Sequence, residues 1–180
     1  MKWIFHAVAF VLASGFVVRA AETPAPPALK VGDPAPDFKL TASNGKEYTL
    51  KEFKGKSAVI LAWYPKAMTG GCTTECNAIR DEMTALSQFK VQVFGASTDP
   101  VEANKEFANR QGYTFPLLSD PDRAVAAAYG VLAPNGKNAL RWTFVIDDKG
   151  IIRHIDREVK PATHGKDLAR VLAELKIPRR

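Results

Sequence analysis

The chain has 180 residues and a formal net charge of +6, from 25 basic and 19 acidic side chains. This length suits one domain with a full hydrophobic core. The basic excess is spread along the sequence without a run of five or six like charges, which argues against a nucleic-acid-binding protein. We therefore expect one globular domain with no nucleic-acid partner.

The first twenty residues have the pattern of an export signal. A short positive start at Lys2 precedes a mostly apolar stretch over residues 3–18, and small or β-branched residues lead to a cleavage point near Ala20. The apolar stretch is shorter than the ~20 residues that a membrane-spanning helix needs, so cleavage is favoured over a retained anchor. The mature protein is then periplasmic or secreted, free of the membrane, in a compartment that permits disulfides.

The composition after this signal sets the domain organisation. Residues 21–30 carry three prolines and no hydrophobic period, which indicates an extended linker. We therefore predict a signal peptide at 1–20, a Pro-rich linker at 21–30 and one folded domain at 31–180.

Within the domain, apolar runs alternate with helical patterns. Asn44-Gly45 between two short runs predicts a hairpin, and the continuous apolar run at 57–64 predicts a central strand covered on both faces. Asp99-Pro100 fits an N-cap with proline at the first helical position, and Asp120-Pro121 fits a second helix start. The predicted strands are 38–40, 47–50, 57–64, 91–97, 115–118, 142–146 and 151–155. The predicted helices are 72–89, 100–110, 122–129 and a last one from His164-Gly165 to near Leu175. This order indicates an α/β fold, a central mixed sheet flanked by helices on both faces, with an N-terminal hairpin.

Cys72 is the first of only two cysteines and opens the helical pattern that follows the central strand. The unpaired N–H groups of a first helical turn and the positive end of the helix dipole both favour an anion there. Such a cysteine can have its pKa lowered well below the free value of about 8.5. We predict that Cys72 is a nucleophilic thiolate.

The second cysteine lies on the same helical face. Cys72, Cys76 and Ile79 follow the spacing of one apolar stripe, so both thiols are predicted to point toward the sheet. Residues four apart on a helix have Cβ atoms about 5–6 Å apart, whereas a disulfide needs about 3.5–4.5 Å. A bridge between the two therefore requires the first turn to unwind. Two roles for Cys76 stay open, a redox partner of Cys72 or a buried core thiol.

A thiolate that attacks an electrophile also needs polar partners. Thr69 supplies a hydroxyl in the turn just before Cys72. Arg141, directly before the strand at 142–146, is our candidate for the fixed positive charge that stabilises the thiolate and the leaving oxygen. The alternative for Arg141 is an ordinary surface arginine.

These residues together resemble a known family. Pro65-xxx-Thr69-xx-Cys72, followed by Thr73, Glu75 and Arg80-Asp81, resembles the peroxidatic-cysteine motif of the peroxiredoxins, and the bacterioferritin comigratory (Q-type) branch in particular. The segments at 31–38, 53–56 and 141–147 resemble other parts of that family, so the likeness covers about Val31 to Leu175.

The resemblance implies a thioredoxin-like fold and thiol-dependent reduction of hydrogen peroxide or alkyl hydroperoxides, without a metal or organic cofactor. By this likeness Cys72 is the peroxidatic nucleophile, Thr69 and Arg141 hold the thiolate and peroxide, Pro65 shields the pocket, and Glu75 organises the arginine. The likeness also implies a second thiol that forms a disulfide and an external, thioredoxin-like dithiol protein that reduces it. The oligomeric state, monomer or homodimer, stays open.

Two positions depart from the family pattern. Gly70 stands where the family usually has proline, which makes the turn more flexible. The Q-type branch commonly carries its resolving cysteine five residues after the peroxidatic one, which is Asn77 here, whereas the thiol is Cys76.

Two other classes of protein are compatible with a pair of cysteines on such a fold. A Sco-like copper chaperone would need a histidine shortly before Asp147, but residues 137–141 contain none. We take His154 and His164 as ordinary surface or packed histidines. An exported thiol:disulfide oxidoreductase would be expected to carry Cys-x-x-Cys, and this spacing is one residue longer.

Overall fold

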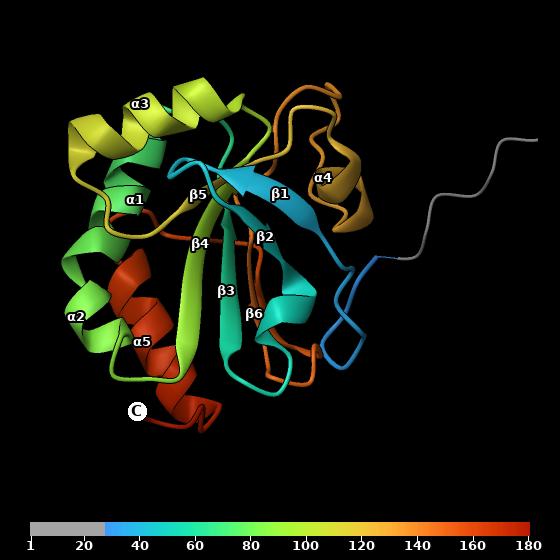
Figure 1. Cartoon of the computed structure of the whole chain (residues 1–180), viewed down its shortest axis with the longest axis vertical. Helices are drawn as coiled ribbons and strands as arrows, with labels where there is room; N and C mark the ends of the chain where they lie inside the picture. The colour runs from blue at the N-terminus through green and yellow to red at the C-terminus, as the bar shows by residue number, and fades with distance from the viewer. Residues whose placement is uncertain (1–27) are drawn as a thin grey trace, which may run out of the picture.

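The structure is a computed structural model and describes residues 28–180, so the predicted signal peptide and most of the predicted linker lie outside the described residues. A seven-stranded mixed sheet in the order β2-β1-β5-β4-β3-β6-β7 forms its centre (Figure 1). The strands are β1 (Lys39–Ala42), β2 (Glu47–Thr49), β3 (Ala58–Trp63), β4 (Val91–Ser97), β5 (Leu117–Ser119), β6 (Thr143–Ile146) and β7 (Ile152–Asp156). The helices are a 3-10 helix η1 (Leu50–Phe53), α1 (Gly70–Asp81), α2 (Met83–Leu86), α3 (Val101–Gln111), α4 (Ala124–Ala128) and α5 (His164–Glu174).

The strand directions follow from the lengths of the connections. β3–β4 and β4–β5 pair in parallel, and each pair is joined by a crossover that contains helix, as parallel strands require. β1–β2 and β6–β7 are antiparallel hairpins, the first turning at Asn44-Gly45, where Gly45 has a φ of +77°. All six residues of β3 are buried, in agreement with its continuous apolar sequence. The predicted mixed α/β sheet with an N-terminal hairpin is confirmed.

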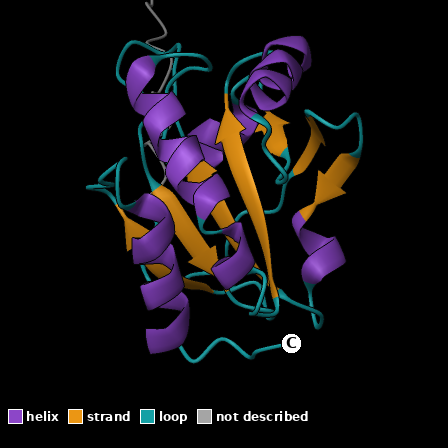
Figure 2. Cartoon of the chain, turned by 90° about the vertical axis from the view of Figure 1, so that its left-hand side faces the viewer, coloured by secondary structure: helices purple, strands orange, loops and turns teal. Residues whose placement is uncertain are grey.

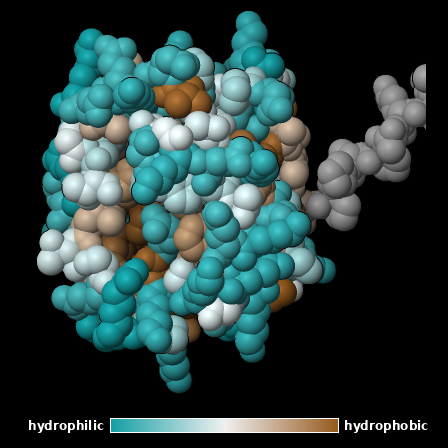
Figure 3. All heavy atoms as spheres, viewed as in Figure 1, coloured by the Kyte–Doolittle hydropathy of each residue, from teal (hydrophilic) through white to brown (hydrophobic). Residues whose placement is uncertain are grey.

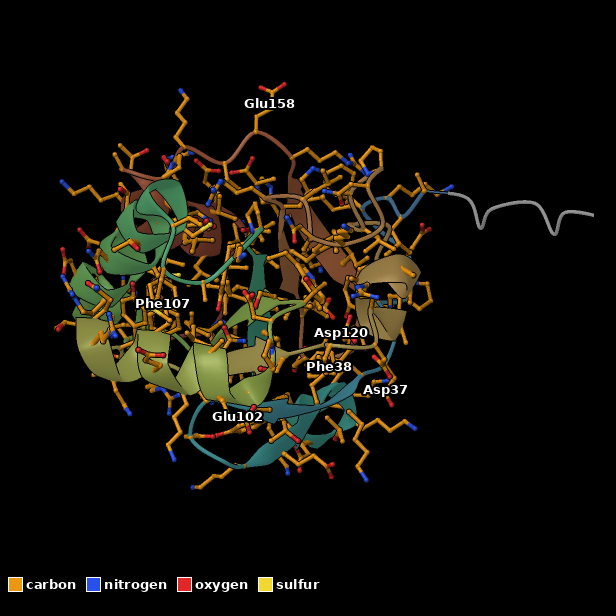
Figure 4. All side chains as sticks on the ribbon, turned by 90° about the horizontal axis from the view of Figure 1, so that it is seen from above. Asp37, Phe38, Glu102, Phe107, Asp120 and Glu158 are labelled. Carbon is orange, nitrogen blue, oxygen red and sulfur yellow. The ribbon has the colours of Figure 1, made fainter. Side chains whose placement is uncertain are left out.

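Two hydrophobic cores lie on opposite faces of the sheet. One contains Cys72, Cys76 and Phe107, and it packs α1, α2, α3 and α5 against the sheet. The other contains Trp63, Phe94 and Tyr129, and it packs α4 and the N-terminal segment against the opposite face. Figure 2 shows the helices of the first core in front of the strands. In Figure 4 Phe107 lies between α3 and α1, whereas Glu158 points outward.

The outer surface of the domain is largely hydrophilic on the face seen in Figure 3. Hydrophobic side chains gather there in a hollow between α2 and β4, a cavity of about 180 Å³ lined by Met83, Val93 and Phe115 among others. None of the helices within residues 28–180 combines the length and hydrophobicity of a membrane-spanning segment.

The helix predicted at 72–89 is wrong in both its start and its continuity. α1 begins earlier, at Gly70, and the chain leaves helical geometry at Glu82 before α2 begins. In a regular helix the carbonyl of Ala78 would accept the N–H of Glu82, which here donates to Ile79 instead. The break coincides with α5, because Gly165 packs against the Ala78 carbonyl and the Glu82 side chain. A neighbouring helix therefore interrupts a pattern that looked continuous in the sequence.

The helix starts predicted from aspartate-proline pairs also need correction. Pro100, not Asp99, is the N-cap of α3, and the Asp99 carboxylate accepts the N–H of Ala67 at 2.8 Å instead. α4 is shorter than the predicted 122–129 because Arg123 adopts a left-handed conformation, with a φ of +66°, just before it. The carboxylate of Asp120 then accepts the N–H groups of Val125 and Ala126 at 3.3 and 2.7 Å. Asp99 therefore stabilises the turn before Cys72 instead of capping α3.

Candidate active site

Cys72 lies in the first turn of α1, at the end of a short turn that follows the central strand. Two side-chain bonds hold this turn: the Ala67 N–H donates to Asp99, and the Thr69 hydroxyl donates to the Lys66 carbonyl at 3.0 Å. Thr69 itself is the N-cap, with extended φ and ψ of −87° and 152°. The thiol is buried, at 1% exposure, at the positive end of the helix. The local sequence thus places a sulfur where a negative charge is stabilised.

Arg141 reaches this sulfur from a distant part of the chain. Its Nη2 lies 3.4 Å from the Cys72 Sγ, within reach of a charge-assisted hydrogen bond. β6 runs antiparallel to β3, with Thr143 opposite Ala62, so Arg141, two residues before β6, lies beside the end of β3. Gly71 leaves the space for the guanidinium, because a Cβ at that position would lie 3.2 Å from Nη2. The structure therefore brings together the two residues that the sequence analysis proposed as nucleophile and cation.

Glu75 joins the arginine to a second buried group. Its side chain is 1% exposed, and one carboxylate oxygen, Oε2, accepts from the Arg141 Nη1. The other oxygen, Oε1, lies 3.2 Å from Nδ1 of His164, whose Nε2 is 3.1 Å from the Thr143 hydroxyl. Burial alone would lower the pKa of Arg141, but the charge of Glu75 and the bond to Cys72 outweigh it, so this pKa is raised. Arg141 thus stays a fixed cation.

Two members of this group were missed by the sequence analysis. His164 is packed, at 1% exposure, which the prediction of a surface or packed histidine allowed, but its contact with Glu75 was not foreseen, and Thr143 was not proposed at all. The only local signal was a histidine at a predicted helix start. Its contact with α1 depends on how α5 packs, which no local pattern contains.

Cys76 lies one turn deeper than Cys72 and differs from it in its surroundings. Both are free thiols on the buried face of α1, as the apolar stripe predicted. Burial raises the pKa of Cys76 well above the usual value, and the charges of Glu75 and Cys72 raise it further, against a smaller opposing effect of Arg141. Cys76 is therefore a protonated thiol while the helix is intact.

The remaining residues proposed for the site lie around the turn. Pro65 is half-buried between β3 and the turn, and Thr69 is exposed with its hydroxyl directed to Lys66 rather than to the sulfur. Met68 has a left-handed φ of +60° and is 42% exposed, so its side chain lies at the surface of this turn. Within residues 28–180, no three His, Cys, Asp or Glu side chains are grouped so as to hold one metal ion.

A cysteine at the start of a helix, on a thioredoxin-like sheet and facing a partly buried arginine, defines a thiol-based redox enzyme. A model described as the AhpC/TSA family matches residues 31–155, and the chain belongs to this family. It is a peroxiredoxin of the bacterioferritin comigratory or Q type and acts as a thiol-dependent peroxidase, the class that acts on peroxides with thioredoxin-like reductants. The predicted thioredoxin-like fold is also confirmed.

Individual relatives agree with this assignment. Peroxiredoxin Bcp of Escherichia coli is 39% identical over 142 residues, covering 76% of this chain and 90% of its own. Alkyl hydroperoxide reductase E of Mycobacterium tuberculosis is 40% identical over 127 residues, covering 69% and 83%. Among solved structures, peroxidoxin BcpB of M. tuberculosis has a TM-score of 0.75 at 33% identity, covering 82% and 98%. A PrxQ variant of Xylella fastidiosa has a TM-score of 0.77 at 26% identity, covering 84% and 99%.

Proposed function

We propose that Cys72 is the peroxidatic cysteine and that the protein reduces hydrogen peroxide and alkyl hydroperoxides. The observation that carries the proposal is the 3.4 Å contact between the Arg141 Nη2 and the Cys72 Sγ in the first turn of α1. Similarity to a Mycobacterium alkyl hydroperoxide reductase and to a Xanthomonas campestris protein described by its alkyl peroxide reduction supports the organic substrates.

The oxidation step uses the groups around this sulfur. The Cys72 thiolate attacks the terminal oxygen of the hydroperoxide, the O–O bond breaks, and the leaving alkoxide or hydroxide takes a proton from water. Cys72 becomes a sulfenic acid. Arg141 stabilises both the thiolate and the charge that develops on the leaving oxygen. In this proposal Thr69 and Pro65 form the mouth of the peroxide pocket, and Glu75 orients Arg141.

Cys76 completes the cycle as the resolving cysteine. Its thiol condenses with the Cys72 sulfenic acid, so that a disulfide forms and water leaves. The two residues lie four apart on a helix, so α1 must open at its first turns for the sulfurs to meet. An external dithiol protein then reduces the disulfide. The export signal proposed at residues 1–20 would place this cycle in the periplasm or outside the cell, where disulfides persist.

Peroxide titration of the reduced protein, followed by mass spectrometry, tests both assignments. The wild type is expected to lose two hydrogens as an intramolecular disulfide forms. Cys76→Ser is expected to stop at sulfenic acid and to proceed to sulfinic acid with excess peroxide, whereas Cys72→Ser stays unmodified.

Two outcomes contradict the proposal in different ways. Sulfinic acid at Cys72 of the wild type, with Cys76 still a thiol, would remove the resolving role and leave a one-cysteine peroxidase. Peroxide consumption that persists in Cys72→Ser would remove the peroxidatic role.

A further inference from the structure

His164 is a buried histidine beside the active site for which the peroxidase chemistry has no use. It is the first residue of α5, is 1% exposed, and has its ring nitrogens on Glu75 and Thr143 rather than on Cys72. Its two ring nitrogens face different elements: Nδ1 lies 3.2 Å from Glu75 on α1, and Nε2 lies 3.1 Å from Thr143 on β6. Gly165 permits this approach, because a Cβ there would lie 2.1 Å from the Ala78 carbonyl of α1.

The contact matters because, among residues 28–180, the Glu75 carboxylate has two side chains within ion-pair distance, Arg141 and His164. Its carboxylate is 1% exposed, with one oxygen on Arg141 and the other facing His164. The imidazole approaches this oxygen at 3.2 Å without the geometry of a hydrogen bond, and if the histidine were removed the buried carboxylate would lose this polar neighbour and be free to move. Arg141 would then lose the anion that holds it beside Cys72. His164 therefore acts on the sulfur through two intermediate side chains.

Glu75 also lies between the two cysteines in the sequence. A disulfide between Cys72 and Cys76 encloses it, and this bridge cannot form while residues 72–76 are helical. Any rearrangement that joins the sulfurs must move Glu75 away from Arg141 and His164. The contacts that stabilise the Cys72 thiolate thus also oppose the opening of α1.

Oxidation of Cys72 affects the contacts that stabilise its thiolate and oppose the opening of α1. A sulfenic acid is neutral, so the attraction between Arg141 and the Cys72 sulfur weakens once the peroxide has reacted. The contacts of Glu75 with Arg141 and with His164 do not involve the sulfur and persist. They still hold this turn of α1 in place before the disulfide forms.

We propose that His164 is a positioning residue that, through Glu75, accelerates oxidation of Cys72 and slows its resolution by Cys76. This inference rests on the proposed function, in which Cys76 resolves the sulfenic acid. The reaction it controls is the condensation of the Cys72 sulfenic acid with the Cys76 thiol, which forms the S–S bond and releases water. Loss of the His164 contact therefore changes the two steps in opposite directions, which general damage to the fold would not do.

Two substitutions of His164 distinguish the contribution of Nδ1 from that of Nε2. His164→Asn places an amide nitrogen near the position of Nδ1 and keeps a donor for Glu75, whereas His164→Gln places its amide near Nε2 and leaves Glu75 without one. His154→Asn is the matched control, because His154 lies on β7 and has no contact with Glu75. Stopped-flow fluorescence gives the oxidation rate, and acid quench with mass spectrometry gives the rate of disulfide formation.

The expected result is a divergence of the two rates in one variant only. In His164→Gln oxidation at neutral pH slows about tenfold and disulfide formation accelerates about tenfold, the ratio that loss of one buried polar contact produces. His164→Asn and His154→Asn retain rates near those of the wild type. If His164→Gln does not fold, Thr143→Val removes the Nε2 partner and is expected to change both rates in the same directions by a smaller factor.

Each of the following results would overturn the inference. Rates that fall together in His164→Gln would show a structural role only, and unchanged rates would show no role. A wild type that forms no disulfide would refute the resolving role of Cys76 and this inference with it. A disulfide that forms in the wild type and at the same rate in His164→Gln refutes the inference alone.

Discussion

Gly71 leaves the space that the Arg141 guanidinium occupies, whereas no group packs against the neighbouring Gly70. A Cβ on Gly71 would lie 3.2 Å from the Arg141 Nη2, whereas a Cβ on Gly70 would meet no atom within 4 Å. Gly70 is the first residue of α1, where the backbone N–H has no partner within the helix. The departure from the family pattern at this position is therefore not required by the packing of the site.

Gly70→Pro is expected to stabilise the reduced protein by about 0.4–1 kcal/mol. Proline suits the first helical position, and Thr69 already has the extended conformation, φ −87° and ψ 152°, that a residue before proline prefers. Urea unfolding of the reduced protein measures the change. A lower midpoint for Gly70→Pro would show that the turn needs the freedom of glycine.

The contact between α1 and α5 determines the shape of the site at the scale of elements. The approach of Gly165 to the Ala78 carbonyl coincides with the end of α1 and positions His164 opposite Glu75. Because α1 carries both cysteines, the stability of its first turns also controls how readily the sulfurs meet. The packing of two helices thus links the thiolate, the arginine and the resolving step.

Gly165→Ala is expected to reduce the free energy of unfolding by about 1–3 kcal/mol, because the new methyl group overlaps the backbone of α1. The displacement of α5 also moves His164 from Glu75, so oxidation of Cys72 by peroxide should slow. Chemical denaturation and stopped-flow oxidation measure the two effects.

Gly70→Ala is the matched control for this substitution, since its methyl group enters open space. It should retain the wild-type oxidation rate. Equal stability of Gly165→Ala and Gly70→Ala would contradict the close packing of α5 on α1.

At the scale of the whole molecule, each hydrophobic core buries groups that cannot ionise in place. Burial raises the pKa values of Cys76 and Tyr64 in the core beneath α1, and the charges of neighbouring groups add to both shifts. Burial likewise raises the pKa of Tyr129 in the core on the other face, with a contribution from Asp37. In the unfolded chain these groups titrate at about 8.5 for cysteine and 10 for tyrosine.

Stability is therefore expected to decrease in alkaline solution. Below about pH 8 both states hold these protons, but above about pH 8.5 the unfolded chain loses the Cys76 proton first while the folded protein keeps it. Each such group lowers the free energy of unfolding by up to about 1.4 kcal/mol per pH unit. Urea unfolding of the reduced protein from pH 7 to 10.5 measures this decrease.

Cys76→Ala isolates the contribution of one group. Its difference in unfolding free energy from the wild type should shift with pH between about 8.5 and 10, in favour of the variant, because the alanine has no proton to lose. A difference that stays constant over this range would show that Cys76 ionises as readily in the folded protein as in the unfolded chain.

Local sequence patterns were sufficient to predict much of the fold of this protein. The Asn44-Gly45 hairpin, the buried β3 and the shared face of Cys72 and Cys76 all depend on residues close together in the chain, and the structure agrees with each. The family resemblance likewise rested on contiguous motifs. Periodicity and turn chemistry therefore predicted the sheet class, helix polarity singled out Cys72 as the candidate thiolate, and the motif resemblance indicated the family.

Only the tertiary structure decided which distant groups surround that thiol. The break at Glu82, the redirection of Asp99 to Ala67 and the contact of His164 with Glu75 each join segments that are far apart in the sequence. Such contacts depend on how α5 packs onto α1 and on how the loop before α3, which carries Asp99, packs onto the turn before α1. Local propensity does not encode this packing. The sequence alone determined that a cysteine begins the helix after the central strand, and packing decided which charges act on its sulfur, because electrostatic effects depend on distance in space rather than along the chain.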